Sequence, residues 1–271
     1  MSDSGIAYYL YCLTPAADGR PVAAIGVDGQ RPVSVRACGE IGAVLSEVEV
    51  GEFCGESAEA RLGDLAWLGP RVCRHEAVIE EVMRQAPVLP ARFATLFTSV
   101  ESLQRSVLER REAIAQFFAQ LGDRQEWAVK GLLNRAGALE SPVASGQPAA
   151  EGPGPAASPG ARYFEEKRRK AQWERDFTLR LKKFCLRAAA ALGARAGAFR
   201  ERHALAPVAG GTEAEVVLNW AFLLSPAGLA DFRERLEGLN GGEAFPGLML
   251  TLAGPWPPYS FAPDLSAGAK S

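Results

Sequence analysis

Apolar residues alternate on both faces of the first strand-like segment in the chain. In residues 6–13, IAYYLYCL, both alternating sets of side chains are apolar, which is typical of a strand inside a sheet. Shorter apolar runs at 33–35 and 41–48 predict two further strands. The segment PVLPARFATLF, 87–97, predicts a fourth strand that is buried on both faces.

Two stretches of the first half have the spacing of amphipathic helices. Apolar residues recur at roughly helical intervals over 57–85, and Gly69-Pro70 predicts a kink or break within that stretch. A second helix is expected over 99–121, because Ser99 is suited to cap it and a glycine follows it directly.

A change of composition divides the chain. The segment QEWAVKGLL, 125–133, predicts a strand that closes the first half, and the order of elements predicts a split βαβ sandwich with helices on one face of a mainly antiparallel sheet. In 141–160, Ser, Pro, Ala and Gly fill 17 of the 20 positions. Such a segment buries too little apolar surface to fold, so we expect a flexible linker between domains at 1–140 and 161–271.

The second half begins with one long helix, predicted over 161–203, whose apolar residues form a continuous stripe. A helix of this length would extend about 60 Å. It is therefore expected to project, to pack against a partner helix, or to break near Gly193 and Gly197. The remaining pattern predicts a strand at 213–224, a helix at 226–238 and a strand at 247–252.

The overall composition is that of an ordinary globular protein, with 48% hydrophobic residues, 23% charged residues and a net charge of −2. This balance predicts no special attraction to nucleic acid or to anionic membranes. No apolar run approaches the ~18 residues of a membrane-spanning helix, and the N-terminal residues lack the features of a signal peptide. The five cysteines form no C-x-x-C pair. We therefore expect a cytoplasmic protein without a metal or cofactor.

Positive charge is concentrated on the long helix. Residues 161–203 carry 13 Lys and Arg against 5 Asp and Glu. A solvated structural face and a face that docks an acidic protein partner would both have this composition. Acidic residues interrupt the basic run and no aromatic platform accompanies it, which disfavours nucleic acid. The candidate partner-binding residues on this helix are Arg175, Arg180, Lys182 and Lys183.

Two segments superficially resemble catalytic motifs. HEAVIEE, 75–81, lacks the second histidine of a helical zinc site and is interpreted as a solvated helix face. GEFCGES, around Cys54, lacks the G-x-S-x-G of a nucleophile elbow. Arg92 stands out for another reason, because a guanidinium in an apolar central strand must find carboxylates or carbonyls. A structural ion pair and an interface role both fit it. The sequence therefore predicts no enzyme.

The closing segment GPWPPYSF, 254–261, is rich in proline and aromatic residues. It is too short and too broken by proline to cross a bilayer, and its spacing is marginal for a polyproline ligand. Leaving the rings of Trp256, Tyr259 and Phe261 in water would be costly. We therefore expect an extended strap that leaves the last strand at Leu252 and packs its rings on the protein.

Together these segments resemble the gas vesicle accessory protein family GvpL/GvpF. The resemblance is carried, in order, by AYYLYCL, PVLPARFATLF, EWAVKG, PGARYFEEKRRK and LTLAGPWPPYSF. Ala94 and Ala128 stand where the family pattern has glycine, Phe164 where it has leucine, and Ala253 where it has threonine. Besides the helix residues named above, the candidate partner-binding or signature residues are Arg92, Phe93, Trp127, Lys130, Trp256 and Tyr259.

The resemblance implies a non-enzymatic accessory protein, a minor component in the assembly of a gas-filled proteinaceous organelle, the gas vesicle. The implied partners are the small hydrophobic main shell protein and other accessory proteins, and not nucleic acid or membrane. The implied fold is α+β with two domains, a modified ferredoxin-like first domain (split βαβ) and a second built around long helices. The alternatives are a ligand-binding regulatory module with a ferredoxin-like domain and an enzyme that uses Cys54 or Arg92.

Overall fold

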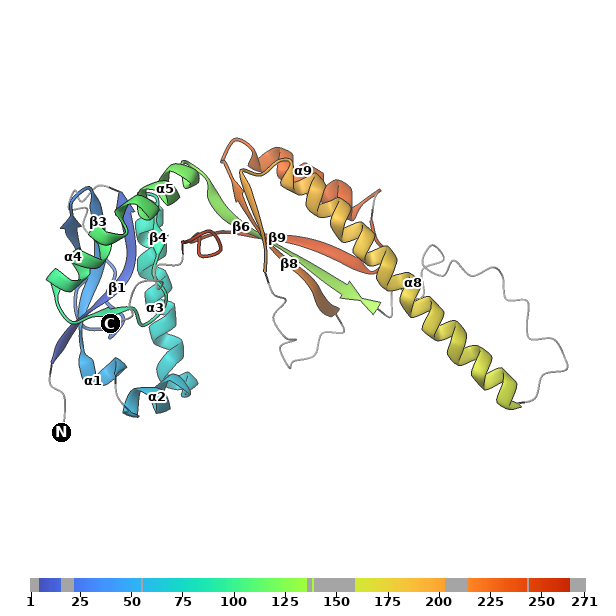
Figure 1. Cartoon of the computed structure of the whole chain (residues 1–271), viewed down its shortest axis with the longest axis horizontal. Coiled ribbons are helices and arrows are strands. Elements are labelled where there is room, and N and C mark those ends of the chain that lie inside the picture. The colour runs from blue at the N-terminus through green and yellow to red at the C-terminus, as the bar shows by residue number, and fades with distance from the viewer. Residues whose placement is uncertain are drawn as a thin grey trace. The chain divides into compact units, whose positions relative to one another are not determined.

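The computed structural model describes residues 5–15, 22–54, 56–135, 138, 159–202, 214–242 and 244–263. The chain forms two units (Figure 1): unit 1 comprises Met1–Gln125 and Trp256–Ser271, and unit 2 comprises Glu126–Pro255. The chain thus passes from unit 1 to unit 2 and back, whereas the sequence predicts one division around 141–160. That predicted linker lies outside the described residues except for its last two positions, which begin a helix.

Unit 1 contains an antiparallel sheet in the strand order β2-β3-β1-β4, and the short β5 also pairs with β1. Its elements are β1 (Ile6–Pro15), β2 (Ser34–Cys38), β3 (Ile41–Glu49), α1 (Val50–Phe53), α2 (Glu56–Leu62), α3 (Leu65–Met83), β4 (Leu89–Pro90), β5 (Leu96–Phe97), α4 (Val100–Glu109) and α5 (Arg111–Leu121). The first three predicted strands are present. The predicted strand at 87–97 is instead two short strands separated by a turn.

Helices cover both faces of this sheet. Strand β1 presents one set of side chains to α3 and another set to the opposite side. The buried Tyr9 packs against His75 of α3, with ring centroids 5.6 Å apart. A bulge directly after Leu10 changes the alternation of the strand, so that Leu10 and Leu13 both face the opposite side. There they line a cavity together with Ile114 of α5. The predicted arrangement, with helices on one face only, is therefore wrong.

Helix ends in unit 1 follow from local chemistry. Ser99 caps α4, since its hydroxyl accepts from the Ser102 amide at 3.1 Å while Ser102 Oγ accepts from the Ser99 amide at 3.2 Å. Gly122 ends α5 in a left-handed conformation with φ 55°. The single helix predicted over 99–121 is nevertheless two helices, because the backbone of Arg110 leaves helical geometry (φ −109°, ψ 10°).

The break predicted at Gly69-Pro70 is displaced. Helix α3 begins at Leu65 and runs through both residues. The interruption lies before it, where Asp64 caps the new helix by accepting from the Ala66 amide at 2.9 Å. Pro70 cannot donate a backbone hydrogen bond inside α3, but the helix continues past it to Met83.

Unit 2 contains a four-stranded sheet in the order β7-β8-β6-β9. Its elements are β6 (Gln125–Asn134), α8 (Pro159–Gly193), β7 (Ala198–Glu201), β8 (Ala214–Leu224), α9 (Leu229–Asn240) and β9 (Leu248–Trp256). The segment 125–133, which its place in the sequence assigns to the first domain, is therefore a central strand of the second sheet. The whole is a mixed α/β fold with two antiparallel sheets, and the ferredoxin-like description of the first domain stays a prediction.

The long helix ends earlier than its pattern predicts. Helix α8 stops at Gly193, one of the two expected breaking points, and the chain then forms β7. Its apolar stripe packs into the core of unit 2, where Phe177, Phe184, Ala188 and Leu192 are at most 3% exposed. The spacing of the stripe therefore identified the buried face of α8, although not its length.

The last strand is longer than expected. Strand β9 reaches Trp256, past the predicted end at Leu252, and includes a cis peptide bond between Gly254 and Pro255. Gly254 has φ 145°, and a Cβ atom there would lie 3.0 Å from the Glu126 carbonyl oxygen. This backbone geometry accommodates glycine and excludes a larger residue.

Candidate functional site

The closing segment is fastened to unit 1 through Tyr259. Its hydroxyl donates to Glu76 Oε1 at 2.8 Å and lies 3.2 Å from His75 Nε2. The two prolines that precede it are buried. The sequence predicts that the aromatic rings of this segment pack on the protein. Tyr259 does so, whereas Trp256 is 44% exposed.

A continuous chain of hydrogen bonds connects this segment to the sheet. The Ala94 amide donates to the Tyr9 hydroxyl at 3.0 Å, and that hydroxyl lies 3.0 Å from His75 Nδ1. Because Tyr259 uses its only proton on Glu76, His75 must donate to it through Nε2. His75 Nδ1 then accepts from Tyr9. Each group in the chain has a partner of the correct polarity, and the imidazole is neutral.

Burial sets the protonation of this network. Desolvation lowers the pKa of His75 from 6.5 to about 4, against a smaller opposing effect of a backbone hydrogen bond with Ala91. Desolvation also raises the pKa of the Glu76 carboxyl, which the hydrogen bond from Tyr259 partly offsets. It raises the pKa of the Tyr259 hydroxyl as well, and Glu76 adds to that rise. A neutral imidazole with both nitrogens engaged fastens a chain segment, but it leaves no free base to act on a substrate.

The interpretation of HEAVIEE, 75–81, as a solvated helix face is wrong for its histidine. His75 is 1% exposed. The signal that reveals this lies in the spacing, since the buried Val78, Ile79 and Val82 follow at three, four and seven positions. That interval places the histidine on the apolar stripe of α3.

Arg92 does not lie in a central strand, as its sequence context predicts. It precedes a tight turn, where its carbonyl accepts from the Thr95 amide at 3.2 Å and from Thr95 Oγ1 at 2.7 Å. Within the described residues its guanidinium forms no ion pair, so the structural pair that its position suggests is not found there. The neighbouring Phe93 packs its ring against those of Tyr9 and His75, at centroid distances of 6.0 and 5.7 Å.

The two signature residues of β6 have different surroundings. Trp127 is 7% exposed in the core of unit 2, and the Arg233 guanidinium lies 5.4 Å from its ring centroid. Glu126, beside it, is fully buried and paired with Arg202. Lys130 is exposed. Trp127 therefore contributes to packing, whereas the side chain of Lys130 is accessible.

Helix α8 bears a groove with a basic rim and an apolar floor. The groove has a volume of about 660 Å³ and is lined by Arg180, Lys183, Phe184, Leu186, Arg187, Phe245 and Pro246. The structure thus separates the four candidate residues of this helix. Arg180 and Lys183 line the groove, whereas Arg175 and Lys182 are exposed outside its lining.

The first part of α8 contributes nothing to the core of unit 2. From Tyr163 to Gln172 each described side chain is exposed, except that of Ala171, which is half-buried. Tyr163 and Phe164 are 61% and 64% exposed, and their ring centroids are 5.8 Å apart. Aromatic residues and arginine are enriched at protein contact surfaces. This part of the helix carries both, with Arg168 and Arg169 close to the two rings in the sequence, and adds to the candidate surface.

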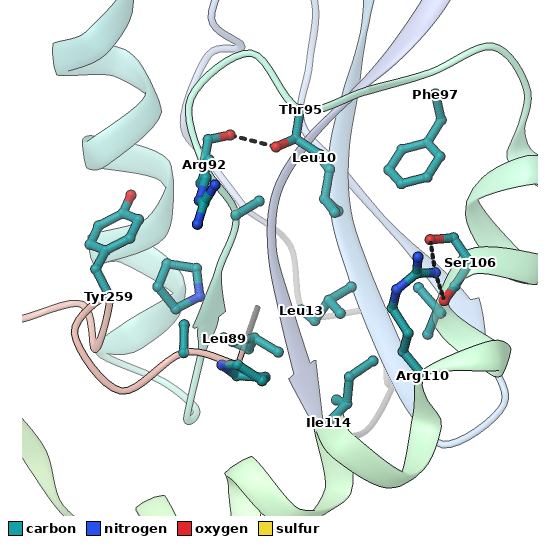
Figure 2. A pocket seen from close by; sticks show the side chains of 15 residues that line it. Leu10, Leu13, Leu89, Arg92, Thr95, Phe97, Ser106, Arg110, Ile114 and Tyr259 are labelled. Atoms are coloured by element: carbon teal, nitrogen blue, oxygen red, sulfur yellow. Dashed lines mark hydrogen bonds between the residues drawn. The ribbon is translucent and has the colours of Figure 1, made fainter. Parts of the chain in front are cut away.

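A cavity of about 290 Å³ lies within unit 1, between the sheet and helices α4 and α5 (Figure 2). Most of its wall is apolar, including Leu10, Leu13, Leu89, Phe97, Val107 and Ile114. The charged groups in the wall are the guanidinium groups of Arg92 and Arg110. Among the described residues that line the cavity there is no Asp or Glu.

Metal and membrane sites are not found in the part of the chain that the structure describes. There, His, Cys, Asp and Glu side chains form no group of three or more that could hold a metal ion. Among the described helices, none has both the length and the hydropathy needed to cross a membrane.

Comparison with known protein families and curated proteins gives one consistent match. The model of the family described as "Gas vesicle synthesis protein GvpL/GvpF" matches residues 7–263. The chain is also 30% identical over 256 residues to gas vesicle protein L of Streptomyces sp. (strain CB03234), an alignment that covers 94% of this chain and 92% of that protein.

Two crystal structures share the fold. Gas vesicle protein GvpF from Anabaena sp. PCC7120 matches with a TM-score of 0.70 at 18% identity, over 96% of this chain and 97% of that one. GvpF from Microcystis aeruginosa matches with a TM-score of 0.62 at 20% identity, over 95% and 99% of the two chains. At such identities the likeness shows the fold alone, with its two antiparallel sheets and flanking helices.

Proposed function

This chain belongs to the gas vesicle synthesis protein GvpL/GvpF family, and from that premise we propose that it is a non-enzymatic accessory protein of gas vesicle formation. In this role it binds the main hydrophobic shell protein and other accessory proteins, and it is located at the gas vesicle within the cytoplasm. Family membership supports a gas vesicle-related role. The surface of α8 supports the binding of partner proteins.

A shell protein that is apolar on its gas-facing side has to be kept from aggregating before it enters the growing wall. A protein that holds it transiently needs apolar contact area together with charge that steers and selects the partner. The groove on α8 offers both in one place, because Leu186 and Phe245 lie beside three basic side chains. Leu186 is 63% exposed, so this apolar surface is open to a partner.

The observation that carries the proposal is the arrangement of the basic rim. Arg180, Lys183 and Arg187 follow one another at three and four positions along α8 and therefore lie on one side of the helix. An acidic amphipathic segment of a partner would place its apolar residues on the floor and its carboxylates against this rim. The long side chains of the rim pair with carboxylates at an exposed edge, where they favour specificity and fast association.

A matched pair of variants tests this surface. The double variant Lys183→Glu/Arg187→Glu reverses two charges in the groove, and Arg175→Glu/Lys182→Glu reverses two on the same helix outside it. The proposal predicts that the groove variant captures about tenfold less shell or accessory protein in a pull-down from co-expressing cells. The second variant should capture as much as the unaltered protein.

The measurement requires that both variants fold, which equal melting temperatures would establish. Equal capture by the two folded variants would contradict docking in the groove. Equal loss by both would assign the effect to the overall charge of α8, and the groove would then have no special part.

A further inference from the structure

The cavity of unit 1 has the size of a small-molecule site. It is partly open to solvent and measures about 290 Å³. Small-molecule sites typically measure ~300–1,000 Å³ and are mostly apolar with a few placed polar groups. The cavity stands at the lower end of that range and has the same kind of wall.

The wall is assembled from elements that are fixed by other contacts. Leu10 and Leu13 face the cavity together because of the bulge in β1, while Val107 and Ile114 come from α4 and α5. Tyr259 contributes from the closing segment (Figure 2). Its hydroxyl is fastened to α3 by the hydrogen bonds described above, so this part of the wall is also held in place.

Arg92 brings a positive charge to the wall, and among the described residues no carboxylate forms an ion pair with it. Its hydrogen bonds in the described structure are made through its carbonyl, which accepts from Thr95 (Figure 2). Those bonds fix the backbone that carries the side chain and leave the guanidinium available. The residue is exposed, so an anion can reach its guanidinium from solvent. A guanidinium that lines an apolar cavity can donate two parallel hydrogen bonds to the carboxylate of a ligand.

Arg110 supplies a second positive charge. Its Nη1 donates to the Ser106 carbonyl at 3.1 Å and to Ser106 Oγ at 3.0 Å, which orients the side chain (Figure 2). Its ion-pair partner Glu109 lies 3.6 Å away and is 62% exposed, so solvent weakens that pair. The side chain of Arg110 itself is 19% exposed. Glu109 therefore compensates the positive charge of Arg110 only weakly.

From these features we infer that the cavity binds a small amphiphilic carboxylate. The hydrocarbon body of the ligand lies against the leucines and Ile114, and the carboxylate accepts hydrogen bonds from Arg92, with Arg110 as a second positive charge. The planar fork of a guanidinium matches a carboxylate. A cationic ligand would find no acidic partner among the described lining residues. This site is independent of the proposed docking on α8.

Octanoate, octan-1-ol and acetate separate the two requirements of such a site. Octanoate has both a charge and a hydrocarbon body, octan-1-ol lacks the charge, and acetate lacks the body. Isothermal titration of the full chain should show saturable binding of one octanoate, at least about tenfold weaker binding of octan-1-ol, and none of acetate. Octanoate should also shift the methyl NMR signals of Leu10, Leu13 and Ile114.

Two substitutions with a control test the residues. Arg92→Gln should weaken octanoate binding about tenfold and leave octan-1-ol binding unchanged. The control Arg36→Gln removes an exposed arginine from β2 of the same unit and should change neither. Val107→Phe places a ring in the cavity and should abolish the binding of both molecules, with the melting temperature as the check on folding.

Several results would overturn the inference. Equal affinity for octanoate and octan-1-ol would show that the cavity recognises no anion, and absence of saturable octanoate binding would show that it is no site. An equal loss of octanoate affinity in Arg92→Gln and Arg36→Gln would show that the loss comes from the change in net charge. Unchanged octanoate binding by a folded Val107→Phe would place the ligand elsewhere. If Val107→Phe does not fold, the two arginine variants decide alone.

Discussion

The two units have the same strand order but are held together by different chemistry. Counted in chain order within each unit, the strands of both sheets follow the same arrangement. The core of unit 1 contains a chain of hydrogen bonds that passes from Tyr9 through His75 to Tyr259. The core of unit 2 is filled by aromatic rings, such as Trp173 stacked on Phe177 at 4.9 Å.

The stability of the two units should therefore depend on different conditions. The stability of unit 1 depends on pH, because its core contains a buried histidine that must stay neutral. It also depends on the closing segment, which comes from the far end of the chain. A core of packed rings depends on volume and shape.

Removing an aromatic ring from the core of unit 2 should cause the largest loss of stability. Phe177 is 1% exposed and also contacts Phe245 at 5.2 Å. Phe177→Ala should lower the free energy of unfolding of unit 2 by about 3–5 kcal/mol. Hydrogen exchange of β8 amides reports this loss, and β1 amides in the same sample should change far less. The control Phe164→Ala, at a 64% exposed position of the same helix, should stay within about 0.5 kcal/mol.

Acid should weaken unit 1 through its buried histidine. The pKa of His75 is about 4 in the folded protein and 6.5 ordinarily, so between these values the unfolded chain binds a proton that the folded chain excludes. This contribution to stability is complete above about pH 6.5 and is lost as the pH falls toward 4, with about 2 kcal/mol lost by pH 5. The raised pKa of Glu76 acts in the opposite direction and offsets part of the loss.

The pH effect is measured by exchange of β1 amides at pH 7 and pH 5, corrected for intrinsic rates, with β8 amides as the internal comparison. His75→Gln removes the titrating group and should flatten the pH dependence of unit 1. An unchanged slope in the variant would contradict the role assigned to this histidine.

Removing the Tyr259 hydroxyl of the closing segment should cause a smaller loss of stability. Tyr259→Phe removes the acceptor of His75 and the donor to Glu76 while keeping the ring. The cost should be about 1–2 kcal/mol in unit 1, because a buried imidazole and a partly buried carboxylate lose their partner. Tyr163→Phe removes a hydroxyl from a 61% exposed ring and serves as the control. Similar melting curves for the two variants would mean that Tyr259 packs without fastening the segment.

The smallest effect concerns two alanines at positions where the family pattern has glycine. Ala94 is left-handed, with φ 61°, so Ala94→Gly should stabilise unit 1 by up to about 1 kcal/mol. Ala128 lies in strand β6 and is 3% exposed, so Ala128→Gly should destabilise unit 2 by about 1 kcal/mol. Chemical denaturation of both variants measures the change in the free energy of unfolding. A change of the same sign in both variants would refute the explanation by backbone geometry.

Features that depend on neighbouring residues could be predicted from the sequence. The cap at Ser99, the stop at Gly122 and the break at Gly193 each follow from the chemistry of one or two residues, and the structure has all three. The buried stripe of α8 follows from periodicity in the same way. The family also follows from short segments, because the resemblance depends on residue identity and not on contacts.

Features that depend on distant partners could not be predicted. The pattern of 125–133 identifies a strand, but its partners β8 and β9 come much later in the chain, so its sequence position alone assigns it to the first domain. The apolar rings of the closing segment predict that it packs, but not that Tyr259 meets His75, 184 positions away. The guanidinium of Arg92 was placed in a strand because nothing local reveals the turn that follows it.

We propose that the groove on α8 binds partner proteins during gas vesicle formation. The most direct test is complementation of a strain that lacks this chain, with vesicles counted by electron microscopy at equal expression of each variant. Lys183→Glu/Arg187→Glu should restore few or no vesicles, while Arg175→Glu/Lys182→Glu should restore them as the unaltered chain does. Full restoration by the groove variant would contradict the claim.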